Sequence, residues 1–245
     1  MLRRSLGCLG HPVGKQWPDL ARYPHSLLTS PAAHVTEEDR KSLLGLQLRR
    51  LLGVAQELNS LSLSAPKVKW DARVIALRSG PDKDEYEVYV NPVARGYDED
   101  ARTSVAPMHG MWENCVSCGV CAAWVLRPQT IAVEYQDEFG ATKQAVLDSM
   151  RARLFMHELD HLDGVTMLQR TPSPDFVASV GALQQRHLWN PAFPSMEAHM
   201  TPLNTFFNYV TNQVEVPRGF EFLTQLQEAF YRARSRPEID QQPSA

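Results

Sequence analysis

The sequence predicts an α+β fold, because helix-like and strand-like segments occupy separate parts of the chain. Apolar residues recur at helical spacing over residues 36–61 and 148–164. Between them, residues 72–79, 85–93 and 130–148 are rich in β-branched and aromatic residues and are interrupted by turn residues. We therefore expect a helix near the N-terminus, two strand hairpins, a second long helix and an extended C-terminal region.

The composition is that of a globular protein without a strong surface charge. The chain has 245 residues, 43% of them hydrophobic and 22% charged, and its formal net charge is −3. A chain of this length can bury a core without disulfide bridges, and four cysteines do not form a secreted disulfide scaffold. The small net charge gives no reason to expect nucleic-acid binding. No apolar run reaches the length of a membrane span.

Local signals place the ends of the expected elements. Thr36 can cap the first helix, and three acidic residues follow it in the first turn. Asp148 is a candidate N-cap and Gly164 a candidate C′ residue of the second long helix. The turn of the second hairpin is expected near residues 137–140. Residues 220–236 predict an amphipathic helix close to the C-terminus.

The first 18 residues differ from the rest of the chain. Arg3, Arg4 and Lys15 precede the first acidic residue, Asp19. A basic, acid-free start with scattered leucines is typical of an organellar transit peptide, and a disordered tail is the alternative. We therefore expect residues 1–18 to precede the folded domain.

The segment HELDH, residues 157–161, carries the strongest chemical signal. In a helix, His157 and His161 lie one turn apart on one face. Two neutral imidazoles so placed can hold one divalent metal ion, with Glu158 beside it as a general base. A catalytic site of this kind needs a third protein ligand. That ligand could be a downstream histidine, His187 or His199, or a cysteine.

Three cysteines, Cys115, Cys118 and Cys121, lie within residues 115–121. A ferredoxin-type cluster would need a fourth cysteine near position 125, which is a valine, and a structural zinc site would also need a fourth ligand. A Cys-x-x-Cys redox pair is expected at a helix N-terminus after a strand, and the sequence context fits this poorly. We predict that Cys118 and Cys121 pack as small apolar side chains.

Three motifs occur in the order in which peptide deformylases carry them. SLSLSAPK (residues 60–67) resembles the family motif G-x-G-x-A-A-x-Q, ENCVS (113–117) resembles E-G-C-x-S, and MHELDH (156–161) resembles Q-H-E-x-D-H. Asn91–Pro92 falls where the family has a strand that ends in Asn-Pro, and the segments WVLRP and YPHSLLTSPA are also similar. The resemblance covers about residues 20–170. We therefore expect a catalytic domain over 19–170 and a C-terminal extension over 171–245.

This resemblance implies antiparallel sheets around the central helix that bears the His-Glu-x-x-His motif. It implies an enzyme that removes the formyl group from the N-terminal formyl-methionine of nascent polypeptides. The resemblance makes Cys115, His157 and His161 the ligands of one divalent metal ion, Fe²⁺ in the native enzyme or Zn²⁺ as its replacement. Glu158 would act as general base, and the backbone N–H of Val116 would help bind the oxyanion.

Several positions depart from the family motifs. The resemblance makes Leu61, Ser62 and Asn114 the candidate substrate-binding residues, but Ser62 and Asn114 replace glycines. Asparagine tolerates positive φ better than most residues, so the turn at Asn114 can survive. Lys67 replaces a glutamine that donates to the oxyanion, and it could donate in its place or point to solvent. The alternative function is therefore a weakened or inactive deformylase-like protein that binds N-terminal peptides or another partner.

Three charged residues near the motifs are expected to have structural roles. We predict that Glu113 and Asp160 form structural hydrogen bonds and that Arg127 is a partner for one of these acids.

The expected partners follow from the family and from the N-terminus. They are N-formyl-methionyl nascent peptides and the organellar ribosome. Because formyl-methionine arises in bacteria and organelles, the resemblance agrees with the basic N-terminus, and we expect a location in the mitochondrion or another translation-competent organelle.

Overall fold

The computed structural model describes residues 20–79, 85–95 and 107–225 of the chain. The expected transit segment, the loop of the first hairpin and most of the expected C-terminal helix lie outside the described residues. Of that helix, residues 221–225 are described and are helical.

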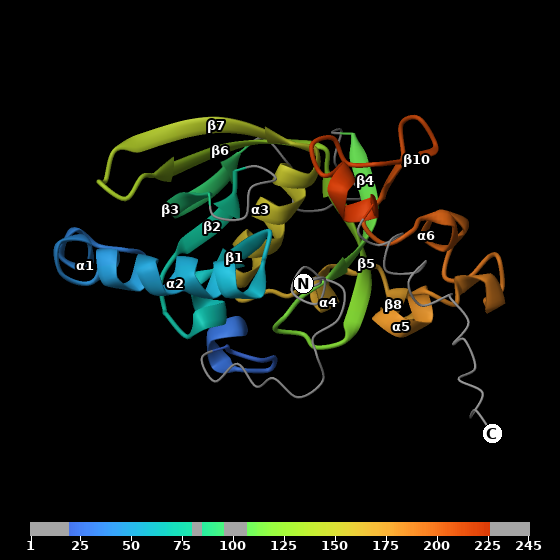
Figure 1. The fold of residues 1–245 in the computed structure, drawn as a ribbon, viewed down its shortest axis with the longest axis horizontal. Helices are drawn as coiled ribbons and strands as arrows, with labels where there is room; N and C mark the ends of the chain where they lie inside the picture. The colour runs from blue at the N-terminus through green and yellow to red at the C-terminus, as the bar shows by residue number, and fades with distance from the viewer. Residues whose placement is uncertain (1–19, 80–84, 96–106, 226–245) are drawn as a thin grey trace, which may run out of the picture.

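Two antiparallel five-stranded sheets form the framework of the described chain (Figure 1). The first has the order β1-β2-β3-β6-β7 and the second the order β10-β9-β4-β5-β8. In the first sheet the bounds are β1 (Ser62–Ser64), β2 (Val74–Arg78), β3 (Tyr86–Arg95), β6 (Thr130–Gln136) and β7 (Thr142–Asp148). In the second they are β4 (Met108–Asn114), β5 (Cys121–Pro128), β8 (Val177–Ser179), β9 (Phe206–Asn208) and β10 (Gln213–Glu215).

The helices confirm the α+β class. The two longest are α2 (Leu44–Leu58) and α3 (Ser149–Leu162), and α3 contacts strands of both sheets. The shorter helices are α1 (Glu37–Ser42), α4 (Met167–Arg170), α5 (Val180–Leu183) and α6 (Met196–Met200). Single 3₁₀ turns span Ser26–Leu28, Ala65–Val68, Pro174–Phe176 and Arg186–Leu188. As the sequence predicts, the strands pair as hairpins before α3, and α3 is central.

The uninterrupted apolar run of β2 has a structural reason. Val74 and Ala76 belong to the core cluster that includes the buried face of α2. Ile75 and Leu77, which point to the opposite face, belong to the cluster that includes Phe155 of α3. The first sheet is therefore covered on both faces, and α3 is held against it by side chains from alternate positions.

The N-terminal helix differs from the sequence prediction. One helix was expected over 36–61, but the structure has α1 and α2, which meet at Leu43. Thr36 does cap α1, because its hydroxyl accepts from the Asp39 N–H at 3.1 Å and the Asp39 carboxylate accepts from the Thr36 N–H at 2.8 Å. The break turns Leu43 and Leu46 to solvent, so these two leucines do not join the apolar face of α2.

The strand expected over residues 85–93 continues to Arg95, and it passes through Asn91 and Pro92, where the family has a strand end. The register of β3 against β6 shifts between Val90 and Val93, and Asn91 has φ +49°. The Asn91 side chain bonds the N–H and the carbonyl of Val35, each at 2.9 Å. This β-bulge accommodates Pro92, which has no N–H to donate to the neighbouring strand, and regular pairing with β6 resumes at Val93.

The ends of α3 are fixed by backbone geometry. Asp148 lies at the N-cap position, but its side chain makes no capping hydrogen bond. Gly164 follows the helix with φ +74°, and a Cβ there would lie 2.7 Å from the Ser30 backbone. A glycine is therefore required both by conformation and by the close approach of residue 30.

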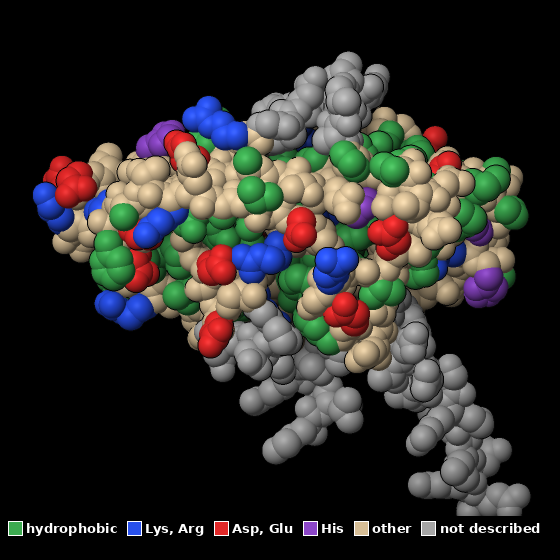
Figure 2. Space-filling model, turned by 90° about the horizontal axis from the view of Figure 1, so that it is seen from above, with side chains coloured by type: hydrophobic (Ala, Val, Ile, Leu, Met, Phe, Trp, Pro, Cys, Tyr) green, Lys and Arg blue, Asp and Glu red, His purple; other side chains and the backbone are tan. Residues whose placement is uncertain are grey.

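The C-terminal extension packs on the domain and adds strands to the second sheet. Strand β8 pairs with β5, and β9 pairs with β4 through His109 and Gly110. Among the described residues, no helix has the length and apolarity to span a bilayer. On the face shown in Figure 2, basic and acidic side chains are interspersed and form no field of a single sign.

Candidate active site

Three segments bring the predicted site residues together. Helix α3 carries His157, Glu158 and His161, Cys115 follows directly after β4, and Lys67 lies in the 3₁₀ turn after β1. One ligand atom each from Cys115, His157 and His161 lies within 4.8 Å of the others. The third ligand candidate is thus Cys115, and neither His187 nor His199 joins this group among the described residues.

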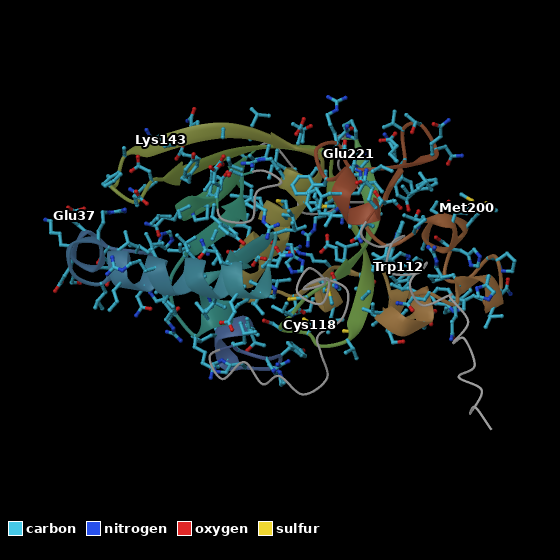
Figure 3. The ribbon with its side chains drawn as sticks, viewed as in Figure 1. Glu37, Trp112, Cys118, Lys143, Met200 and Glu221 are labelled. Atoms are coloured by element: carbon cyan, nitrogen blue, oxygen red, sulfur yellow. The ribbon has the colours of Figure 1, made fainter. Side chains whose placement is uncertain are left out.

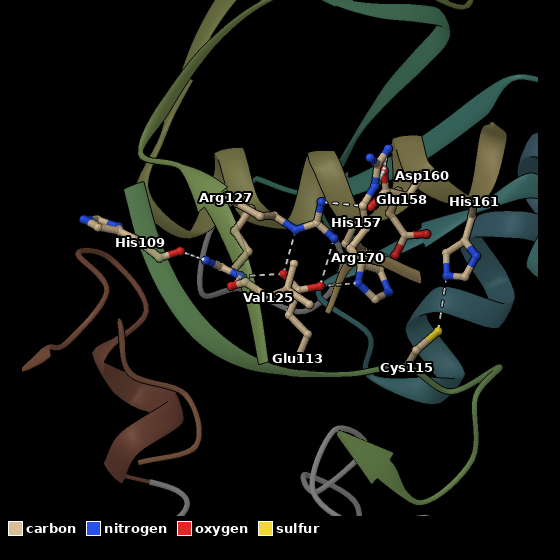
Figure 4. Close-up of polar contacts among 12 residues, drawn as sticks. His109, Glu113, Cys115, Val125, Arg127, His157, Glu158, Asp160, His161 and Arg170 are labelled. Atoms are coloured by element: carbon tan, nitrogen blue, oxygen red, sulfur yellow. Dashed lines mark hydrogen bonds and ion pairs between the residues drawn. The ribbon is translucent and has the colours of Figure 1, made fainter. Parts of the chain in front are cut away.

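The hydrogen bonds of the two histidines leave the right atoms for a metal ion. His157 Nδ1 lies 2.9 Å from Glu113 Oε2, which leaves its Nε2 for coordination. His161 Nε2 lies 3.3 Å from Cys115 Sγ, and its buried Nδ1 has no partner in the described chain. One thiolate and two imidazoles form a donor set that suits a divalent transition metal ion. The residues therefore fit one divalent metal ion, and Figure 4 shows them side by side.

The surroundings of Cys115 favour its thiolate form. The hydrogen bond with Cys118 has the largest effect and lowers the pKa of Cys115; burial raises it, and the positive charge of Lys67 lowers it again. The net result is a pKa of Cys115 well below the usual value. Burial lowers the pKa of His157, but its bonds with Cys115 and Glu113 outweigh this and raise the pKa to about 9.

Glu158 is held by two donors on a single oxygen. Lys67 Nζ lies 2.7 Å from Glu158 Oε1, and the Ser62 hydroxyl donates to the same oxygen at 2.8 Å. Oε2 of Glu158 is buried and has no hydrogen-bond partner within the described chain. Burial raises the pKa of Glu158, but the charge of Lys67 offsets this and the net shift is downward. One oxygen is therefore fixed, and the other is available to a reactant.

Lys67 does not point to solvent, so that alternative is wrong. The residue is only 3% exposed. Burial lowers the pKa of Lys67, but the charges of Cys115 and Glu158 more than compensate, and the net pKa is raised. Lys67 is therefore a cation inside the site, and its role as an oxyanion donor stays a prediction.

A buried ionic network supports the candidate metal ligands through the bond of Glu113 with His157. Arg127 binds both oxygens of Glu113, at 2.7 and 2.9 Å, and also Asp160 at 2.9 Å. Arg170 binds the other oxygen of Asp160. Burial raises the pKa of Glu113, but the charge of Arg127 and the bond with His157 bring it well below the usual value. The expected structural roles of both acids are present, and Arg127 serves both rather than one.

Arg153 and Arg170 are members of the network that the sequence analysis did not predict, and Arg153 is the more deeply buried of the two. Arg153 lies on α3 one turn before His157, is buried, and donates to the Glu113 carboxylate and to the His109 carbonyl. A charged residue at i−4 from a predicted ligand, on the buried face of the helix, was the available signal. Burial lowers the pKa of Arg153 to about 10, so it stays charged at neutral pH.

The remaining predicted residues take three different positions. Leu61 is buried in an apolar cluster with Met111. Asn114 is half-buried at the end of β4 and does not adopt the positive φ that a glycine would allow there. Val116 is half-buried in the turn that Cys118 N–H closes on the Cys115 carbonyl at 3.0 Å. The role of the Val116 N–H stays a prediction.

The other two cysteines of the run support the turn. Cys118 and Cys121 are free thiols, both half-buried, and they pack against the apolar cluster that contains Cys115. The Cys121 thiol donates to the Cys118 carbonyl at 3.2 Å. Burial and the neighbouring Cys115 raise the pKa of Cys118, and burial raises the pKa of Cys121. Both side chains therefore pack as the sequence predicts, and their raised pKa values favour the protonated thiol.

The two antiparallel sheets, the central helix and the Cys-His-His group together define a metallohydrolase-type site. The family model of polypeptide deformylases matches residues 17–176, which is more than half of the chain. The protein therefore belongs to the peptide deformylase family and is a deformylase-type hydrolase.

Known sequences and structures agree with this assignment. The chain is 29% identical over 146 residues to a peptide deformylase of Thermosynechococcus vestitus, which covers 59% of this chain and 73% of that protein. It is 30% identical over 130 residues to peptide deformylase 2 of a Nostoc strain, covering 50% of this chain and 69% of that one.

Solved structures show the same fold. The peptide deformylase of Synechococcus elongatus in complex with actinonin aligns with a TM-score of 0.58 and 24% identity, over 72% of this chain and 91% of that chain. A class I type b peptide deformylase of Acinetobacter baumannii aligns with a TM-score of 0.55 and 25% identity, over 62% and 97%.

Proposed function

We propose that this protein removes the formyl group from the N-terminal formyl-methionine of nascent polypeptides. The observation that carries the proposal is the buried group Cys115, His157 and His161, with the unpartnered Oε2 of Glu158 next to it in sequence and in the helix. Family membership supplies the reaction class.

Cys115, His157 and His161 would hold the metal ion. When bound, a divalent ion lowers the pKa of water and polarises a carbonyl group. Glu158 Oε2 accepts a proton from the attacking water and returns it to the leaving amine. The bonds of Lys67 and Ser62 to Oε1 hold the carboxylate in one orientation during both transfers. Lys67 and the Val116 N–H are the candidate donors to the oxyanion.

The sheet edges around this group suit an extended peptide. Strand β1 is the outer strand of its sheet, and β9 covers β4 only at His109 and Gly110. In the described part of the chain, no strand covers the other half of that β4 edge, which leads to Cys115. A peptide can add to such edges through backbone hydrogen bonds, with its side chains alternating between the two sides. This supports a peptide as the substrate.

Metal identity, partners and location complete the proposal. We propose Fe²⁺ as the native ion and Zn²⁺ as its replacement, since the ligand set accepts both. We propose that residues 1–18 are a transit peptide, that residues 19–170 are the catalytic domain and that residues 171–245 are an extension of it. Formylated nascent peptides at the mitochondrial ribosome are the proposed substrate source.

Formate release from formyl-Met-Ala-Ser tests the activity directly. The full chain is loaded anaerobically with Fe²⁺ or with Zn²⁺, and metal content is measured on the same samples. We expect release from the unsubstituted protein and a loss of about 10²- to 10⁴-fold in Glu158→Gln, the usual contribution of a general base. With one metal ion per chain, release no greater than that of Glu158→Gln would count against the proposal.

A second candidate is a peptide-binding protein with little or no turnover. The observation that favours it is the ion pair of Lys67 with Glu158 at 2.7 Å, because it ties the general base to a cation inside the site. This candidate predicts binding of formyl-Met-Ala-Ser with the same affinity in the unsubstituted protein and in Glu158→Gln, and no formate from either.

A further inference from the structure

An apolar cluster of side chains lies next to the metal-ligand group. Met150 and Leu154 share the face of α3 that carries His157 and His161, because these positions recur at helical spacing. Leu61, which precedes β1, joins the same cluster. Met111 of β4, four residues before Cys115, joins it as well. The cluster therefore joins residues next to the two sheet edges along which the peptide is proposed to bind.

The C-terminal extension fills this place. Phe220 and Leu223 belong to the same cluster and are only 5% and 8% exposed. Phe206 of β9 completes it. Phe206, Phe220 and Leu223 are buried against Leu61, Met111 and Met150, so the protein's own side chains occupy this position.

We propose that Phe220 and Leu223 take the place of the substrate's first apolar side chain, so that residues 217–224 compete with the peptide for the site. The inference rests on the proposed function for the identity of the competing side chain, a methionine. An intramolecular competitor lowers the apparent affinity by the fraction of molecules in which it is undocked.

The contacts of the segment suit reversible docking. Its described hydrogen bonds are local, such as Phe220 N–H to the Pro217 carbonyl at 3.1 Å and Leu223 N–H to the Phe220 carbonyl at 3.0 Å. Arg218 and Glu221 face solvent. The segment is therefore attached to the cluster by apolar side chains, which another apolar side chain can replace. Phe206 differs, because strand pairing fixes β9 to β4.

The test is peptide affinity in the full-length protein with metal bound. Formyl-Met-Ala-Ser is titrated calorimetrically into Glu158→Gln, which removes turnover, and into the same protein with Phe220→Ser and Leu223→Ser added. If the segment is docked in 90–99% of molecules, the added substitutions tighten binding about 10- to 100-fold. Val210→Ser with Val216→Ser is the matched control, since both valines are exposed on the same extension, and it should leave affinity unchanged.

Hydrogen–deuterium exchange of residues 217–225 in the chain without those serine substitutions gives a second readout. Saturating peptide should raise exchange there and should not do so in the β6–β7 hairpin. This measurement holds even if the double variant fails to fold.

The outcomes separate the two proposals. Tighter binding with displaced residues 217–225, but no formate from the unsubstituted protein, supports the competitor and sinks the proposed activity. Formate release with unchanged affinity in the double variant overturns the competitor alone. Weaker binding in the double variant also overturns it, because Phe220 and Leu223 would then line the peptide site instead of occupying it.

Discussion

The buried pair of Lys67 and Glu158 gives the sharpest test of the site's electrostatics. Lys67→Met keeps the length of the side chain and removes its charge. At 2.7 Å and an effective dielectric constant of about 20, the pair attracts by about 6 kcal/mol. Part of that is offset by the cost of burying two charges, so removing one partner of a buried pair costs about 3–5 kcal/mol. For a chain of this size, that corresponds to a fall in Tm of about 6–20 °C.

The metal ion changes the expected result. A divalent cation at Cys115, His157 and His161 supplies positive charge to the Glu158 carboxylate, so Lys67→Met should lower the Tm of the metal-loaded protein by less than half of that amount. Differential scanning calorimetry with and without Zn²⁺ measures both values. Lys143→Met is the control, because Lys143 is exposed and lies far from the site in Figure 3; it should change stability by about 0.5 kcal/mol or less. Equal losses of Tm in metal-free Lys67→Met and Lys143→Met would refute the reasoning. So would a larger loss of Tm in Lys67→Met with Zn²⁺ bound than without it.

Three other predictions concern the ligands and the helix that carries them. Since the pKa of His157 is raised to about 9 and a metal ion binds only the neutral ring, Zn²⁺ affinity should rise about tenfold per pH unit from pH 7 to pH 9. Calorimetry of Zn²⁺ binding in two buffers should show that one proton is released per ion bound. Release of no proton at pH 7.5 would contradict the raised pKa of His157. Glu113→Gln weakens the support of His157 and should lower metal affinity about 10- to 100-fold in a chelator competition, whereas exposed Glu134→Gln should not. Gly164→Ala forces a Cβ against the Ser30 backbone and should lower the free energy of unfolding in urea by more than about 2 kcal/mol. Gly53→Ala, with open space in α2, should raise it by about 0.5–1 kcal/mol. Similar effects of the two substitutions would show that the Gly164 contact is unimportant.

Local chemistry made much of the fold predictable. Thr36 and Asp39 form their capping box through neighbours in sequence, and the β6–β7 turn forms near Asp137 as expected. The break between α1 and α2 was not predictable, because Leu43 and Leu46 satisfy the helical period although both are exposed. The register shift of β3 between Val90 and Val93 was not predictable either. It depends on the bond of Asn91 with Val35, which is remote in sequence.

The ligand set was readable because two of its members are one helical turn apart. His157 and His161 need only a helix to face the same way, and the motif around Cys115 selected the third. The direction of the Lys67 side chain was not predictable from the sequence, because a lysine side chain is long enough to reach either solvent or a buried neighbour. It is decided by Glu158, which lies 91 residues away in sequence and 2.7 Å away in space.

By itself, the sequence determined the α+β class, the family and the Cys-His-His group, because these depend on periodicity and on short motifs. The tertiary structure decided which buried charges meet and which distant segments pack together. Arg127 joins two acids from β4 and α3, and Phe220 reaches Leu61 from the other end of the chain. Such contacts depend on the packing of distant segments, because only that packing removes apolar side chains from water and brings opposite charges close enough to offset the cost of burying them.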